Sequence, residues 1–217
     1  YCAGVSVQTL HEVISTLKLS RIAKLNPNPL RACGLFRLNR ARKLLEEYIG
    51  ADTQFSDLKT PFRCVATDLL SGRTVCMKEG NVVDAVIASS SVPGAFSPIE
   101  RDGMLLVDGG VIERVPVREV KQMGADVIVA VDVLGDLVAN VSEPPQNLID
   151  TFLRYIDVID TRVTGSKRRS RMKDIALWLV PELGDMDQYK VKNLDFAYEK
   201  GYELGKANTD AIRALIE

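Results

Sequence analysis

The chain has 217 residues, of which 46% are hydrophobic and 26% charged, with a formal net charge of −1. These values are typical of a globular protein with an apolar core that needs no disulfide staples. The near-neutral charge gives no electrostatic basis for sequence-independent binding, so we expect no nucleic-acid partner. No apolar run approaches the roughly 20 residues that span a bilayer, which leaves contact with a membrane surface open.

Four cysteines are scattered along the chain without CxxC spacing, at Cys2, Cys33, Cys64 and Cys76. A disulfide framework or a zinc site needs paired or clustered ligands. We therefore expect free thiols in a reducing compartment, the cytoplasm, with peripheral membrane contact allowed.

The first residues of the chain are typical of the C-terminal end of a helix. Tyr1-Cys2-Ala3 is followed by Gly4, the residue that commonly ends a helix. Ser6 is then a predicted N-cap for a new helix that runs to Lys18. We expect earlier helical turns to precede Tyr1.

The next elements alternate between helix and strand patterns. The predicted elements up to residue 110 are a helix over Asn39–Ile49 closed by Gly50, strands over Phe62–Leu69 and Arg73–Met77 around a Ser71-Gly72 turn, a helix from the cap Asn81 through Ser89, a break at Pro93-Gly94, and a strand over Met104–Val107 that ends at Asp108-Gly109-Gly110.

The second half continues the alternation. It predicts a helix from Pro116 to Gly124, an apolar strand over Asp126–Val133, a helix after Pro144-Pro145 with Leu148, Phe152, Tyr155 and Ile159, a basic run over Lys167–Lys173, a strand over Ile175–Val180, and a closing helix over Leu194–Ile216. Alternating strands and helices favour an α/β fold with a mostly parallel central sheet and helices on both faces. We expect residues 1–217 to form a single domain.

Three aspartates, Asp68, Asp108 and Asp132, follow or end predicted strands, where sites of open α/β sheets lie. Asp108 differs because Gly109 and Gly110 follow it and leave room beside the carboxylate for a substrate or a nucleophile. Asp-Gly is also a common hairpin turn, so the tripeptide alone leaves both interpretations open.

The surrounding motifs carry a resemblance. Four segments occur in order, namely ATDLLSG (Ala66–Gly72), ASSSVPGAFSP (Ala88–Pro98), LLVDGGVIERVPV (Leu105–Val117) and MGADVIVAVDV (Met123–Val133). Together they resemble the bacterial patatin-like phospholipase family, and the stretch Tyr1–Leu10 is similar to the segment that follows the nucleophile helix of that family. The resemblance covers nearly the whole chain and implies a three-layer α/β fold.

The resemblance implies a Ser–Asp dyad that hydrolyses lipid esters without a metal ion or other cofactor. A serine in a GxSxG turn attacks the ester carbonyl, the aspartate of a DG[AG] motif is the base, and a glycine-rich loop binds the oxyanion. Asp108 matches the aspartate of that motif, and Gly109 and Gly110 match its turn.

This chain departs from the family pattern, because it has neither GxSxG nor the glycine-rich oxyanion loop. Gly4-Val5-Ser6-Val7-Gln8 comes closest, but Gln8 replaces the second glycine, so we reject Ser6 as the nucleophile. The prediction is an N-terminally truncated domain that supplies the aspartate and is inactive alone. His11, the only histidine, is expected to be solvated or partly packed, which agrees with a dyad.

A carboxylate that acts directly on serine is a weak base at its reference pKa of about 3.9, so burial must raise that pKa. We therefore expect Asp108 to be substantially buried. Small side chains upstream are candidates to line the acyl pocket, namely Ser89, Ser90, Ser91 and Pro93. Asp68 is expected to fix the turn at Ser71-Gly72, and Asp132 to cap the loop after its strand.

The leading hypothesis is a lipase-type or phospholipase-type serine acyl hydrolase. Two alternatives stay open: a non-catalytic lipid-binding or acyl-binding module of the same fold, and a Mg²⁺-dependent phosphotransferase that uses Asp68, Asp108 and Asp132. A weaker hypothesis is that the basic run Lys167–Lys173 binds anionic lipid headgroups.

Overall fold

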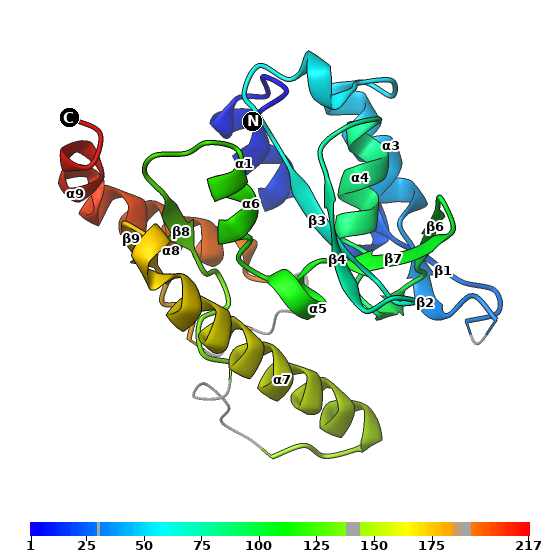
Figure 1. Ribbon diagram of the computed structural model, residues 1–217. Coiled ribbons are helices and arrows are strands. Elements are labelled where there is room, and N and C mark those ends of the chain that lie inside the picture. The colour runs from blue at the N-terminus through cyan, green and yellow to red at the C-terminus, as the bar shows by residue number, and fades with distance from the viewer. Residues whose placement is uncertain (30, 138–143, 185, 187–191) are drawn as a thin grey trace. The chain divides into compact units, whose positions relative to one another are not determined.

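The computed structural model describes residues 1–29, 31–137, 144–184, 186 and 192–217. They form two compact units, Tyr1–Glu113 and Arg114–Glu217 (Figure 1). Each unit has its own cluster of buried apolar side chains. The assignment of residues 1–217 to one domain stays a prediction, because compactness alone does not show whether a unit folds independently.

The first unit contains short helices and seven strands within its described residues. Its elements are α1 (Val7–Ser15), α2 (Leu19–Ile22), β1 (Lys24–Leu25), β2 (Gly34–Arg37), α3 (Asn39–Ile49), the 3₁₀ turn η1 (Phe55–Asp57), β3 (Cys64–Asp68), β4 (Arg73–Met77), α4 (Val82–Ser89), β5 (Gly94–Phe96), β6 (Ile99–Arg101), β7 (Met104–Asp108) and α5 (Gly110–Glu113).

Local sequence signals located several of these elements correctly. The bounds of α3 and β4 are those predicted, and Gly50 follows α3 with φ +87°. Ser6 caps α1, since its Oγ accepts a hydrogen bond from the Thr9 amide at 3.0 Å. That helix ends at Ser15 rather than at the predicted Lys18.

The largest sheet of the described residues has the strand order β4-β3-β7-β6, and all of its pairs are antiparallel. A mostly parallel central sheet is therefore not confirmed. For the pairs β3-β4 and β6-β7 the physical reason lies in the connections, because strands joined by a short turn must run antiparallel. Asp102 and Gly103 both have positive φ, 51° and 75°, and join β6 to β7 in a two-residue turn.

Parallel pairing occurs elsewhere in the described residues. β2 pairs with β5 in parallel and with β1 antiparallel, and β8 (Val129–Val131) pairs in parallel with β9 (Leu177–Leu179) in the second unit. The mixture of sheets and helices agrees with an α/β class. The strands β1, β2, β5 and β6 were not predicted, because segments of two to four residues carry little periodicity.

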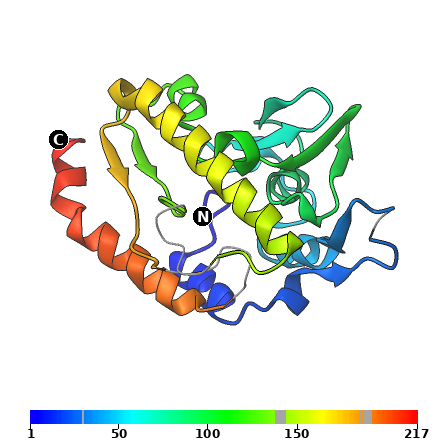
Figure 2. The same cartoon turned by 90° about the horizontal axis from the view of Figure 1, so that it is seen from below.

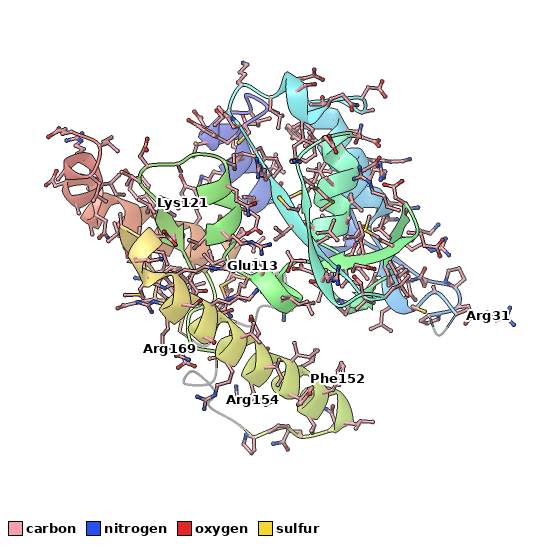
Figure 3. The ribbon with its side chains drawn as sticks, viewed as in Figure 1. Arg31, Glu113, Lys121, Phe152, Arg154 and Arg169 are labelled. Atoms are coloured by element: carbon pink, nitrogen blue, oxygen red, sulfur yellow. The ribbon has the colours of Figure 1, made fainter. Side chains whose placement is uncertain are left out.

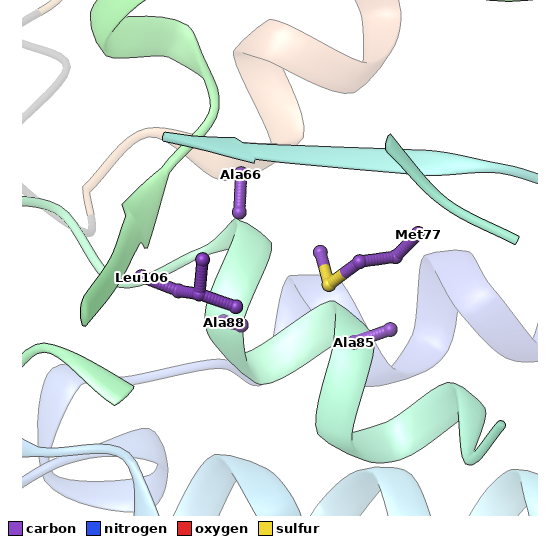
Figure 4. Packing of buried hydrophobic residues seen from close by; sticks show 5 residues of the cluster. All are labelled: Ala66, Met77, Ala85, Ala88 and Leu106. Atoms are coloured by element: carbon purple, nitrogen blue, oxygen red, sulfur yellow. The ribbon is translucent and has the colours of Figure 1, made fainter. Parts of the chain in front are cut away.

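The core of the first unit lies between α4 and the antiparallel sheet. Ala85 and Ala88 of α4 pack against three strand residues, Ala66, Met77 and Leu106 (Figure 4). Alanine at these helix positions lets α4 approach the strands closely. The cap residue Asn81 accepts a hydrogen bond from the Asp84 amide at 3.0 Å, as the sequence predicted. These contacts fix β7, the strand that ends at Asp108.

The second unit contains helices around the β8-β9 pair, whose strands lie side by side in Figure 2. Its other elements are α6 (Val117–Gln122), α7 (Leu148–Arg171), the 3₁₀ turn η2 (Met172–Asp174), α8 (Leu194–Ala207) and α9 (Thr209–Ala214). β8 is shorter than the predicted strand, and Val131 and Val133 are 49% and 54% exposed. The helices that we expected on both faces of the sheet do not cover these two side chains within the second unit.

No helix within the described ranges combines the length and the apolar character that crossing a bilayer requires.

Leu106 offers a direct test of the core of the first unit, because its side chain is fully buried against α4. Leu106→Ala is expected to lower the free energy of unfolding by about 2–5 kcal/mol, through lost apolar burial and the cavity left behind. Chemical denaturation measures this change. The control Leu70→Ala removes a side chain that is 70% exposed and should change stability by less than about 0.5 kcal/mol. Equal effects of the two variants would contradict the described core.

Candidate functional site

Asp108 is the last residue of β7 and lies at the carboxyl end of this strand. Its amide donates a hydrogen bond to the Ser91 carbonyl at 2.9 Å, and it lies opposite Ala66 of β3. The carboxylate Oδ1 accepts a hydrogen bond from the Gly110 amide at 2.7 Å. The residue is partly buried, which is less than the substantial burial that we expected from the sequence.

The two glycines after Asp108 are required by close approach. A Cβ on Gly109 would lie 2.3 Å from the carbonyl oxygen of Val65 and 2.7 Å from its Cγ2. A Cβ on Gly110 would lie 2.9 Å from Oδ1 of Asp108. Glycine at the first position lets the chain turn against β3, and glycine at the second lets its amide reach the carboxylate. Together they fix the orientation of the Asp108 carboxyl group.

The serine segment lies next to this turn. Ser89 Oγ donates to the Val65 carbonyl at 2.7 Å, and the fully buried Ser91 donates from Oγ to the Ile87 carbonyl at 2.8 Å. Ser90 is exposed, and Pro93 is partly buried. The backbone of Ser91 and the hydroxyl of Ser89 thus hold the surroundings of Asp108, whereas the lining of an acyl pocket by these residues stays a prediction.

Asp68 has a structural role at the other end of the strand pair. Its carboxylate accepts hydrogen bonds from the Ser71 hydroxyl at 2.6 Å, from the Leu105 amide at 3.0 Å, and from the Leu70 and Ser71 amides at 3.2 Å. These bonds, the Ser71 hydroxyl first, lower the pKa of Asp68. The predicted role in the turn is confirmed, and the bond to Leu105 also ties this turn to β7.

Asp132 belongs to a buried ion-pair network in the second unit. Arg114 Nη2 donates to Asp132 Oδ2 at 3.0 Å, and Arg114 Nη1 donates to Asp160 Oδ2 at 2.5 Å. Burial raises the pKa of Asp160, while the Arg114 guanidinium opposes this effect. Asp132 Oδ1 also accepts from the Gly135 amide at 3.2 Å, so its predicted role in capping the following loop is confirmed.

The carboxylates of Asp68 and Asp132 are engaged in contacts within their own units, which does not favour the phosphotransferase alternative. The Asp68 carboxylate accepts four hydrogen bonds from its own turn and β7, and Asp132 is paired with Arg114. Within the described part of the chain, no group of three or more His, Cys, Asp or Glu side chains could hold a metal ion.

Sequence reasoning missed the Arg114 network, because Arg114 and Asp160 lie 46 residues apart and no local motif marks a buried arginine. It also missed the closeness of Gly109 to Val65, although the Asp-Gly-Gly signal pointed to an unusual turn. The remaining predicted position, His11, lies on α1 and is partly buried.

The family model described as patatin-like phospholipase matches residues 1–121, which include the whole first unit. An NTE family protein of Mycobacterium tuberculosis is 30% identical over 135 residues, which cover 62% of this chain and 37% of that protein. Lysophospholipases named nte1 from Emericella nidulans and Aspergillus fumigatus are 29% and 28% identical over 189 residues. The matches cover 75% of this chain but only 12% of each fungal protein.

Gly109→Ala tests the close approach between the turn and β3. The added methyl group would overlap the Val65 backbone, so we expect the free energy of unfolding to fall by about 1–3 kcal/mol. The matched control is Gly201→Ala in α8, where a Cβ meets no atom within 4 Å. That variant should raise stability by about 0.5–1 kcal/mol, because alanine is the better helix former. Denaturation of both variants distinguishes steric overlap from a general effect of the substitution.

Asp68 gives a pH-dependent prediction. The pKa of Asp68 is lower in the folded chain than in the unfolded chain, where it is about 3.9. The ionised carboxylate therefore stabilises the folded chain fully above that pH. This stabilisation is lost as the pH falls through the folded-state pKa. Asp68→Asn should therefore destabilise the protein at neutral pH, and its difference from the native chain should shrink on acidification.

Ser71→Ala is the companion variant, because it removes the hydroxyl that contributes most to the lowered pKa of Asp68. It should lose part of the same pH dependence. A destabilisation by Asp68→Asn that is constant from neutral pH to about pH 3 would contradict this interpretation.

Proposed function

This chain belongs to the patatin-like phospholipase family, and we propose that the complete protein is a serine acyl hydrolase that cleaves carboxylic esters of lipids. The matched region, residues 1–121, includes Asp108 and both glycines. The names of the fungal relatives, which are lysophospholipases, support a lipid ester as the substrate class. Because the chain spans 37% or less of the length of the relatives described above, the activity of the whole protein is part of the proposal.

In the proposed mechanism, Asp108 is the general base of a Ser–Asp dyad. Its carboxylate accepts the proton of a serine hydroxyl while the serine oxygen attacks the ester carbonyl carbon. The tetrahedral intermediate expels the alcohol, which takes up the proton, and leaves an acyl-serine. Water, deprotonated by the same carboxylate, then attacks the acyl carbon, and the serine oxygen takes back the proton as the fatty acid leaves. The nucleophile comes from polypeptide outside these 217 residues, so we expect the chain alone to be inactive.

The observation that carries this proposal is the geometry at the end of β7. The Gly110 amide orients the Asp108 carboxylate at 2.7 Å, and Gly109 brings the turn against Val65 without a side chain in the way. An oriented carboxylate at a strand end fits direct proton transfer from serine. Fixed orientation matters because a base must lie within hydrogen-bond reach of the proton that it abstracts.

The proposed location is the cytoplasm, in contact with membrane lipid. The four cysteines are free thiols, as expected in a reducing compartment.

Burial raises the pKa of Cys64 to about 12. A thiol with this pKa stays protonated and unreactive at neutral pH. Cys64 therefore acts as a packing residue beside the core of the first unit.

The test uses the complete protein and a serine-directed fluorophosphonate probe. Asp108→Asn keeps the size of the side chain but removes the base, so both the labelling rate and ester turnover should fall about 10²–10⁴-fold. The control Asp102→Asn changes an exposed aspartate in a turn with positive φ, a conformation that asparagine also adopts, and should leave both rates unchanged. Undiminished turnover by Asp108→Asn would refute the proposed base.

A further inference from the structure

Helix α7 carries a stripe of large apolar side chains on its solvent side. Leu148 is 85% exposed, Phe152 57%, Tyr155 61% and Ile159 44%. Successive spacings of four, three and four residues place these four side chains on one face, which we call the α7 stripe. An apolar face of three helical turns left in water is unfavourable by itself and indicates a binding surface.

The opposite face of α7 is already engaged within the second unit. Leu153, Asp157, Asp160 and Thr164 repeat with the same spacing, and Thr164 is buried with its hydroxyl on Asp160. Asp160 in turn pairs with the buried Arg114. Rotating α7 to cover the stripe would break this buried ion pair and leave a charge buried without its partner. The exposure of the stripe is therefore fixed by the packing of the inner face.

The C-terminal part of α7 and the beginning of the turn η2 after it are strongly basic. Residues 162–173 contain six basic side chains and no acidic one, namely Arg162, Lys167, Arg168, Arg169, Arg171 and Lys173. Arg162 continues the line of the stripe, and Arg162, Arg168, Arg169 and Lys173 are exposed. Figure 3 shows Phe152 and Arg169 toward opposite ends of this helix. The apolar segment is thus followed directly by a cationic one.

We propose that α7 binds the surface of an anionic lipid bilayer. The α7 stripe enters the boundary between headgroups and acyl chains, and the basic segment after it binds anionic headgroups. Apolar side chains followed by clustered cations complement a surface that is both apolar and anionic, as the surface of an anionic bilayer is. The inference deepens the proposed lipid hydrolysis by naming the surface that reaches the substrate, but the binding itself needs no dyad.

The experiment measures co-sedimentation of the 217-residue chain with vesicles of phosphatidylcholine, alone or with an equal amount of phosphatidylglycerol. We expect preferential binding to the anionic vesicles, weakened by salt. The double variant Arg162→Glu, Arg169→Glu should reduce the partition coefficient about thirtyfold or more, at about 1 kcal/mol for each basic residue near the surface. Phe152→Ser with Tyr155→Ser should reduce it at least about tenfold.

Matched controls lie on other exposed helices of the same unit. Lys206→Glu with Arg213→Glu makes the same change in net charge on α8 and α9, and Phe196→Ser with Tyr202→Ser removes two exposed aromatic rings from α8. Both controls should bind anionic vesicles as the native chain does. Circular dichroism and thermal unfolding verify that each variant is folded.

Three results would overturn the proposal. The first is equal binding to both kinds of vesicle, and the second is an equal loss of binding in the α7 variants and the controls. The third is a dimer of the native chain in light scattering that Phe152→Ser with Tyr155→Ser converts to a monomer without any change in vesicle binding, which would make the stripe a contact between copies. Asp108→Asn must bind vesicles normally, so failure of the dyad and failure of this surface give different results.

Discussion

The close approach of Gly109 to β3 is the constraint on which the candidate site depends. Only a residue without Cβ lets the chain after β7 turn over the Val65 carbonyl. This turn brings the Gly110 amide to the Asp108 carboxylate and begins the short helix α5. The Ser91 carbonyl holds the other side of Asp108 through its amide. The orientation of the carboxyl group thus rests on backbone contacts, which are less adaptable than side-chain contacts.

Local signals in the sequence predicted the elements that surround this turn. Caps at Ser6 and Asn81, the helix ended by Gly50, and the turn held by Asp68 all depend on residues within a few positions of one another. Such signals act through hydrogen bonds or backbone conformations of nearby residues, so one sequence is enough to locate them. The Asp-Gly-Gly motif belongs to the same group, and its position at the end of β7 agrees with the prediction.

What could not be predicted depends on contacts between distant residues. The direction of strand pairing is an example, because the apolar character of Met104–Val107 does not say whether its neighbour runs parallel or antiparallel. The buried Arg114 network and the exposed face of α7 are others. Apolar positions of α7 at helical spacing were correctly assigned to a helix, but periodicity does not show whether such a face meets protein or solvent.

The tight turn at Asp102-Gly103 has a consequence for how this chain tolerates changes in length. Because the connection has only two residues, it sets the register of β6 against β7, and β7 in turn is paired with β3. Side chains of a strand alternate between its two faces, so an inserted residue that shifted β7 by one position would turn Leu106 out of the core and move Asp108 away from its partner Ala66 on β3. Gene variants that lengthen this hairpin would therefore affect the carboxylate at the far end of the strand, through alignment alone.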